Sequence, residues 1–191
     1  MNYVFMIIGA AFVHNYVLTQ FLGLCPFFGV SKKTETAVGM GLSVMFVMTL
    51  SSMMTYLFYI LILAPLNITH LQTVVFILII ASIVQFLEVF MKKKLASLYN
   101  LLGLYLPLIT VNCAIFGVAL INIRDGFSFA EMVVNSIGAG GGFLLAIVIL
   151  AGIRERLETS PDIPEVFKGF PLALFSAGLM SIAFMGFQGL F

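Results

Sequence analysis

Long apolar runs separated by short polar segments are the feature that most limits how this chain can fold. A transmembrane helix needs about 20 consecutive apolar residues, whereas barrel strands alternate over about 10 residues. The pattern therefore predicts an all-α integral membrane protein. Six spans are predicted, at residues 3–30, 37–63, 71–91, 98–121, 130–152 and 170–188, and the first is interpreted as a span rather than a cleaved signal.

Charged residues are too few for a water-facing surface. They make up 9% of the 191 residues, against about 25% in soluble domains, while 62% are hydrophobic. The connecting segments leave no room for a soluble domain, so we expect residues 1–191 to form a single transmembrane domain surrounded by lipid. The net charge of +1 gives no indication of a nucleic-acid partner.

The basic residues are distributed unequally between the two sides of the predicted helices. Cytoplasmic loops of membrane proteins carry an excess of Lys and Arg, so the loops after spans one, three and five are predicted to be cytoplasmic and both termini to lie outside. The opposite side carries only Arg124. The basic residues on the predicted cytoplasmic side are Lys32, Lys33, Lys92, Lys93, Lys94, Arg154, Arg156 and Lys168.

The two cysteines occur in similar motifs, CPFFGV at 25–30 and CAIFGV at 113–118. Each motif ends the first span of one half of the chain. With three spans per half, a repeat must be inverted across the membrane, so we predict inverted three-helix repeats at about 1–96 and 97–191. A match this short in an apolar sequence also has a simpler explanation, which is chance.

Both motifs coincide with expected helix breaks. Proline is favoured in the first turn of a helix and breaks one already formed, so the first span should unwind near Gly23 and Leu24, with a short helix restarting at Pro26 and Cys25 as its cap. In the fourth span, Pro107 precedes Thr110 and Asn112, two possible caps. Broken spans at matching positions indicate a buried site, although single Pro and Gly residues often only kink a membrane helix.

Three interpretations of Cys25 and Cys113 remain open from the residues alone: inert core thiols, a disulfide, or metal ligands. At a helical rise of 1.5 Å per residue, their distances from Lys32 and Arg124 place both thiols in the middle part of the bilayer. A [2Fe–2S] cluster requires four thiolates. If this chain binds one, a second chain must supply the other two, and a related subunit in the opposite orientation is the simplest source.

Other polar groups have simpler explanations. Glu88 is interpreted as an ion pair with Lys92, four residues later, rather than as part of an ion path. His14 and Asn15 are expected to be a hydrogen-bonded packing pair. The glycines of GAGGG at 138–142 should permit close helix packing, and the segment from Arg154 is expected to be a solvated cytoplasmic loop.

Four segments resemble the A-type subunit of the Rnf electron-transport complex, in a family that includes the D and E subunits of the sodium-translocating NADH:quinone oxidoreductase. The likeness covers essentially the whole chain, and Cys25–Pro26 and VFKG at 166–169 favour the Rnf member over the sodium-pump E subunit. The segments are FLGLCPFFGVSKK at 21–33, LPLITVNCAIFG at 106–117, AGIRER at 151–156 and GLMSIAFMG at 178–186.

This resemblance implies a subunit of a translocase in a bacterial or archaeal cytoplasmic (inner) membrane. Such a complex transfers electrons between ferredoxin and NAD⁺ and couples this to Na⁺ or H⁺ movement. It implies an intramembrane [2Fe–2S] cluster bound by Cys25 and Cys113 together with two cysteines of a homologous E-type subunit. Other subunits carrying flavin and iron–sulfur clusters are implied as partners. No independent active site is expected.

Two other functions remain possible on the sequence alone. An inverted-repeat transporter or channel without redox chemistry would need polar residues around a cavity at the membrane midplane. A structural assembly subunit would not need its cysteines.

Overall fold

The computed structural model describes residues 3–66, 71–94, 106–159, 164 and 168–189. Within these ranges the regular structure is entirely helical, which confirms the all-α prediction. Four helical stretches are long and apolar enough to cross a membrane, and a fifth candidate is a bent helix pair. The predicted repeat boundary near residue 96 and the beginning of the predicted fourth span lie outside the described residues.

The first apolar run is a series of short helices rather than one rod. It comprises α1 (Tyr3–Ile8), a π-helical turn (Gly9–Val13), α2 (Tyr16–Thr19) and α3 (Leu24–Val30). The stretch Tyr3–Thr19 and α3 meet at an angle of 86°. The prediction that the first span is broken is therefore confirmed.

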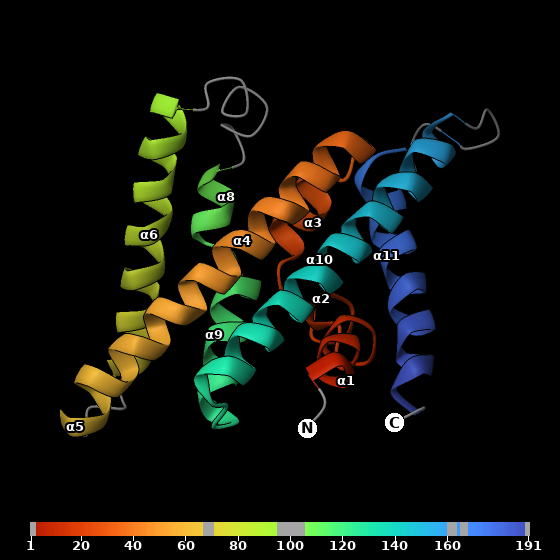
Figure 1. The fold of residues 1–191 in the computed structure, drawn as a ribbon. Coiled ribbons are helices and arrows are strands. Elements are labelled where there is room, and N and C mark those ends of the chain that lie inside the picture. The colour runs from red at the N-terminus through yellow and green to blue at the C-terminus, as the bar shows by residue number, and fades with distance from the viewer. Residues whose placement is uncertain (1–2, 67–70, 95–105, 160–163, 165–167, 190–191) are drawn as a thin grey trace.

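Most of the remaining α-helices that the structure describes are longer, although two are short (Figure 1). A π-helical turn (Tyr59–Leu63) and α5 (Ala64–Leu66) follow α4, and a 3₁₀ turn (Gly186–Gly189) follows α11. The helix α11 is apolar but shorter than the long candidate spans. The helices are α4 (Thr34–Phe58), α6 (Gln72–Lys94), α8 (Leu106–Thr110), α9 (Cys113–Arg124), α10 (Phe129–Glu158) and α11 (Phe170–Met185).

The centre of the molecule is the antiparallel pair α4 and α10. Their backbones approach closely at two points, where Gly140 lies against Met45 and Gly41 against Leu144. Towards the other end of the pair, the rings of Tyr56 and Phe129 are 6.0 Å apart. Most of the buried apolar residues of these two helices belong to one core cluster that also includes residues of α2, α3 and α9.

The glycine-rich stretch of α10 permits close packing against the start of the chain, as predicted. A Cβ at Gly138 would lie 3.0 Å from Ala10 Cβ, and one at Gly142 would lie 2.9 Å from the Ala11 carbonyl oxygen. Larger side chains at these positions would separate α10 from the π-helical turn.

Both chain ends lie at the same end of the molecule in Figure 1, beside the turn between α9 and α10. The turn between α3 and α4, the end of α6 and the end of α10 lie at the opposite end. Arg124, which ends α9, therefore lies at the other end of the molecule from the basic residues near these three helix ends, and the side of the membrane on which each lies stays a prediction.

Candidate metal centre

The break in the first span is built on two residues with left-handed backbone. Phe21 has φ +57° and Gly23 has φ +81°, and α3 begins directly after Gly23. The prediction that Cys25 caps a helix starting at Pro26 is therefore wrong by two residues. Gly23 takes the cap because glycine adopts a left-handed conformation without steric cost, while Pro26 falls in the first turn, where its missing N–H is not needed.

The fourth span is interrupted at Val111 and Asn112, between α8 and α9. The Asn112 side-chain oxygen accepts a hydrogen bond from the N–H of Ala114 at 3.0 Å, which confirms the predicted cap. Cys113 is the first residue of α9. Unlike the first span, this one passes as a single stretch from Pro107 to Arg124.

The two breaks are in contact. The N–H of Gly23 donates a hydrogen bond to Cys113 Sγ, with an N···S distance of 2.9 Å. A Cβ at Gly23 would lie 3.0 Å from Ala114 Cβ and 3.2 Å from Asn112 Oδ1, so the approach requires glycine. Cys25 follows two residues later, and the structure thus brings the two cysteine-bearing segments together.

Neither thiol is bonded to the other. Cys25 is exposed and Cys113 is half-buried, and both are free cysteines. Among the residues that the structure describes, no three His, Cys, Asp or Glu side chains are grouped as a metal site would require. The chain therefore offers two free thiols and an N–H donor to sulfur, a donor set that suits half of a four-thiolate cluster but not a complete one.

Two polar side chains bond to the backbone around α2, one from the first span itself and one from α11. The amide group of Asn15 donates to the carbonyl oxygens of Ala11 (3.1 Å) and Gly142 (3.0 Å), and its oxygen accepts from the Val17 N–H. The Ser181 hydroxyl donates to the Leu18 carbonyl oxygen at 2.6 Å. Irregular backbone inside a membrane requires such partners.

The predicted packing pair at His14 and Asn15 is correct only for Asn15, since the side chain of His14 is exposed. His14 caps the end of the π-helical turn, and Asn15 caps the start of α2.

Arg154 is not in a solvated loop, contrary to the prediction. It lies in α10, which continues to Glu158, and only 4% of its surface is exposed. Its guanidinium group donates to the Phe28 carbonyl oxygen (3.1 Å) and to Ser31 Oγ (2.9 Å). Arg154 thus caps the carboxyl end of α3, the helix that carries Cys25. The chain between residues 153 and 159 contains no helix-breaking residue, and this signal could have placed Arg154 in the helix.

Glu88 is half-buried on α6, one turn before Lys92. The ion pair between these two residues stays a prediction.

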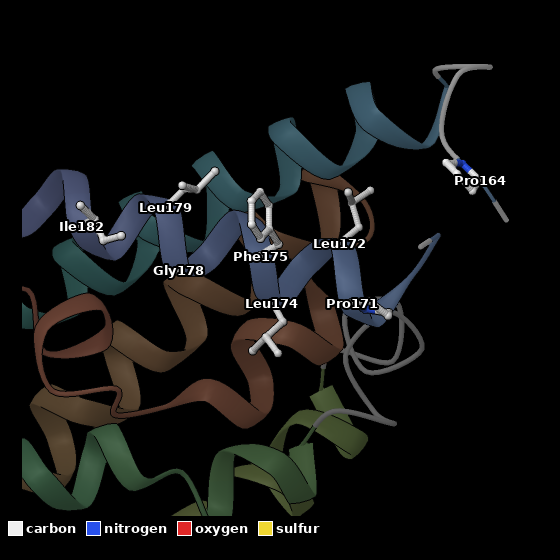
Figure 2. A pocket seen from close by; sticks show the side chains of 8 residues that line it. All are labelled: Pro164, Pro171, Leu172, Leu174, Phe175, Gly178, Leu179 and Ile182. Carbon is white, nitrogen blue, oxygen red and sulfur yellow. The ribbon is translucent and has the colours of Figure 1, made fainter. Parts of the chain in front are cut away.

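Two cavities differ sharply in character. One of about 250 Å³ adjoins Cys113 and is lined also by Thr110, Val111 and Asn112 together with apolar residues of α6. The other, of about 710 Å³, runs along α11, and every side chain that Figure 2 labels there is apolar. A surface such as this second one suits lipid chains rather than a polar ligand.

Comparison with known proteins supplies a family for this arrangement. The sequence profile described as "Rnf-Nqr subunit, membrane protein" matches residues 3–191. The chain belongs to the Rnf-Nqr family. The resemblance found in the sequence is thereby confirmed, and family membership also agrees with the apolar helices of the structure.

Individual relatives match over nearly the whole length. The chain is 58% identical over 190 residues to the A-type subunit of the Na(+)-translocating ferredoxin:NAD(+) oxidoreductase complex of Acetobacterium woodii, covering 100% of this chain and 98% of the relative. It is 54% identical over 189 residues to the A-type subunit of the ion-translocating oxidoreductase complex of Pasteurella multocida, covering 99% and 98%. A Vibrio vulnificus protein with the latter name is 52% identical, with the same coverage.

Proposed function

We propose that this chain is the A-type subunit of an ion-translocating ferredoxin:NAD⁺ oxidoreductase complex and binds half of an intramembrane [2Fe–2S] cluster. The names of its relatives support the first part, and they favour this complex over the related sodium-translocating NADH:quinone oxidoreductase. One observation carries the second part, namely the hydrogen bond between the Gly23 N–H and Cys113 Sγ, which joins the two broken spans at their cysteines.

In this proposal Cys25 and Cys113 are cluster ligands, and a homologous E-type subunit supplies two further cysteines. The bound cluster would accept and release electrons between cytoplasmic and outer redox subunits of the complex. This chain's own contribution is positional. Gly23 permits the contact and donates to sulfur, Asn112 starts α9 at Cys113, and Arg154 holds the far end of α3.

We also propose six spans arranged as two inverted repeats, with both termini outside. The motif glycines support this, because Gly29 and Gly117 follow the cysteines at the same spacing. A Cβ at Gly117 would lie 2.7 Å from Leu22, and one at Gly29 would lie 3.8 Å from Leu108. Each motif glycine therefore faces a leucine of the opposite broken span, so the two spans approach each other at corresponding points of the two motifs.

A solute transporter is less well supported. The buried amides of α9 and α10 are bonded to each other, with Asn135 donating to Asn122 at 2.7 Å and Asn122 to Ser136 at 3.1 Å. The cavity beside Cys113 is lined mainly by apolar side chains.

The test is iron content and electron paramagnetic resonance of the purified, reduced complex. We expect a [2Fe–2S] signal that is absent from both Cys25→Ser and Cys113→Ser. Ser43→Ala is the matched control, because this hydroxyl is bonded within its own helix to Gly39. The proposal is rejected if the complex lacks this signal, or if the signal survives in both cysteine variants.

A further inference from the structure

Asn112 has a hydrogen-bond donor that nothing in the described chain uses. Only 3% of the residue is exposed. Its Oδ1 is occupied by the Ala114 N–H, whereas its Nδ2 is buried without a hydrogen-bond partner. Buried polar side-chain atoms in native proteins almost always have a partner, so an unpaired one requires an explanation.

Asn15 provides an internal comparison. It caps α2 in the same way, accepting from the N–H two residues further on at 3.2 Å. Its amide nitrogen, however, donates to two carbonyl oxygens, those of Ala11 and Gly142. Serine would cap either helix without an amide nitrogen. Capping therefore explains the oxygen of Asn112 but not its nitrogen.

The surroundings of Asn112 indicate what this nitrogen could bind. The residue precedes Cys113 and lines the same cavity of about 250 Å³. The other side chains around that cavity are apolar except for Thr110 and Cys113 itself. A ligand reaching this place would be held by the Cys113 sulfur, which already accepts the N–H of Gly23.

We propose that Asn112 Nδ2 donates a hydrogen bond to the sulfur atoms of the iron–sulfur cluster and thereby raises its reduction potential. This inference rests on the proposed function of Cys113 as a ligand. Reduction adds negative charge to the cluster, and N–H donors to its sulfur atoms stabilise that charge. Asn112 is thus a tuning residue, while Gly23 supplies the second donor from the opposite span.

The variant Asn112→Ser tests this, because it keeps a capping oxygen and removes only the amide donor. The measurement is a redox titration of the purified complex, followed by electron paramagnetic resonance. We expect an intact cluster whose reduction equilibrium constant falls by up to about tenfold, which is about 59 mV for a one-electron couple. Asn15→Ser is the control, since it alters a similar cap away from the cysteines and should leave the potential unchanged.

A second variant covers the case in which Asn112→Ser does not assemble. Asn112→Asp keeps both the shape and the cap but replaces the donor with a negative charge, so it should lower the potential at least as far. A separate measurement, thermal unfolding, needs no cluster. In a complex that carries Cys25→Ser, adding Asn112→Ser should not lower the unfolding temperature below that of Cys25→Ser alone, because the unpaired donor is removed.

The outcomes separate this inference from the proposed function. A cluster present at an unchanged potential in Asn112→Ser or Asn112→Asp overturns the role of Asn112 and leaves the cluster proposal intact. A complex without any cluster in the unsubstituted protein overturns both.

Discussion

Replacing Gly23 with alanine should disrupt the contact between the two broken spans. Gly23 has φ +81°, and an added Cβ would lie 3.0 Å from Ala114 Cβ, 3.1 Å from the Phe143 ring and 3.2 Å from Asn112 Oδ1. The substitution therefore imposes both a backbone penalty and a packing penalty, at the position whose N–H donates to Cys113 Sγ.

The two penalties can be estimated separately. A left-handed conformation costs a non-glycine residue roughly 1–2 kcal/mol. Inserting a methyl group into a packed interior costs about 1–3 kcal/mol, so Gly23→Ala should lose roughly 2–5 kcal/mol in all. Gly126→Ala is the matched control, because Gly126 has φ +66° but nothing within 4 Å of an added Cβ. It should lose only the backbone contribution of about 1–2 kcal/mol.

The assay combines thermal unfolding of the purified complex with its iron content and resonance signal. We expect Gly23→Ala to unfold at a lower temperature than Gly126→Ala and to lose most of its cluster, whereas Gly126→Ala retains a full complement. Equal cluster content and equal unfolding temperatures in the two variants would refute the claim that Gly23 brings the cysteine-bearing segments together.

Three further substitutions test the frame around the site. Gly142→Ala should lower the unfolding temperature, because its Cβ would meet backbone at 2.9 Å, while Gly141→Ala, with open space, should not; equal effects would contradict close packing here. Arg154→Met should cost about 1–3 kcal/mol in thermal unfolding and reduce cluster content, because it removes the hydrogen bonds to the Phe28 carbonyl and to Ser31; the exposed Arg156→Met is the control, and a neutral result would remove Arg154 as the cap of α3. Ser181→Ala should cost about 1–3 kcal/mol in thermal unfolding by leaving a buried carbonyl unpaired, and an unchanged midpoint would mean that this bond is dispensable.

The sequence predicts the local chemistry of the site well, because local rules decide it. Proline and glycine near Cys25 mark a break, and the asparagine before Cys113 marks a cap; both are observed. The error of two residues at α3 arises because Gly and Pro both favour a helix start. The helix starts after Gly23 because glycine adopts the left-handed conformation without steric cost. Pro26 does not prevent this earlier start, since it lies within the first turn, where its missing N–H is not needed.

The sequence could not predict which distant residues would form hydrogen bonds with each other. Arg154 resembles a surface residue in a charged segment, and its burial depends on the carboxyl end of α3, which lies more than 120 residues earlier in the chain. Asn15 likewise depends on Gly142, and Ser181 on Leu18. Arg154 and Ser181 satisfy carbonyl groups of the broken first span, at Phe28 and Leu18, whereas Asn15 of that span donates to a carbonyl group of α10. No local pattern indicates which helix will supply the partner.

The exposed apolar residues at the two breaks give the proposal of a partner protein a second argument, independent of the number of thiols. Phe21 is 57% exposed with a left-handed backbone, and Val111, at the other break, is 76% exposed. Irregular backbone at membrane depth is tolerated only where protein or a water-filled cavity covers it. Cys25 is exposed on the same segment as Phe21, so a protein that covers the breaks also reaches the thiol. The proposed ligand count and the irregular backbone therefore favour the same proposal, namely a second membrane protein seated over the place where the two broken spans meet.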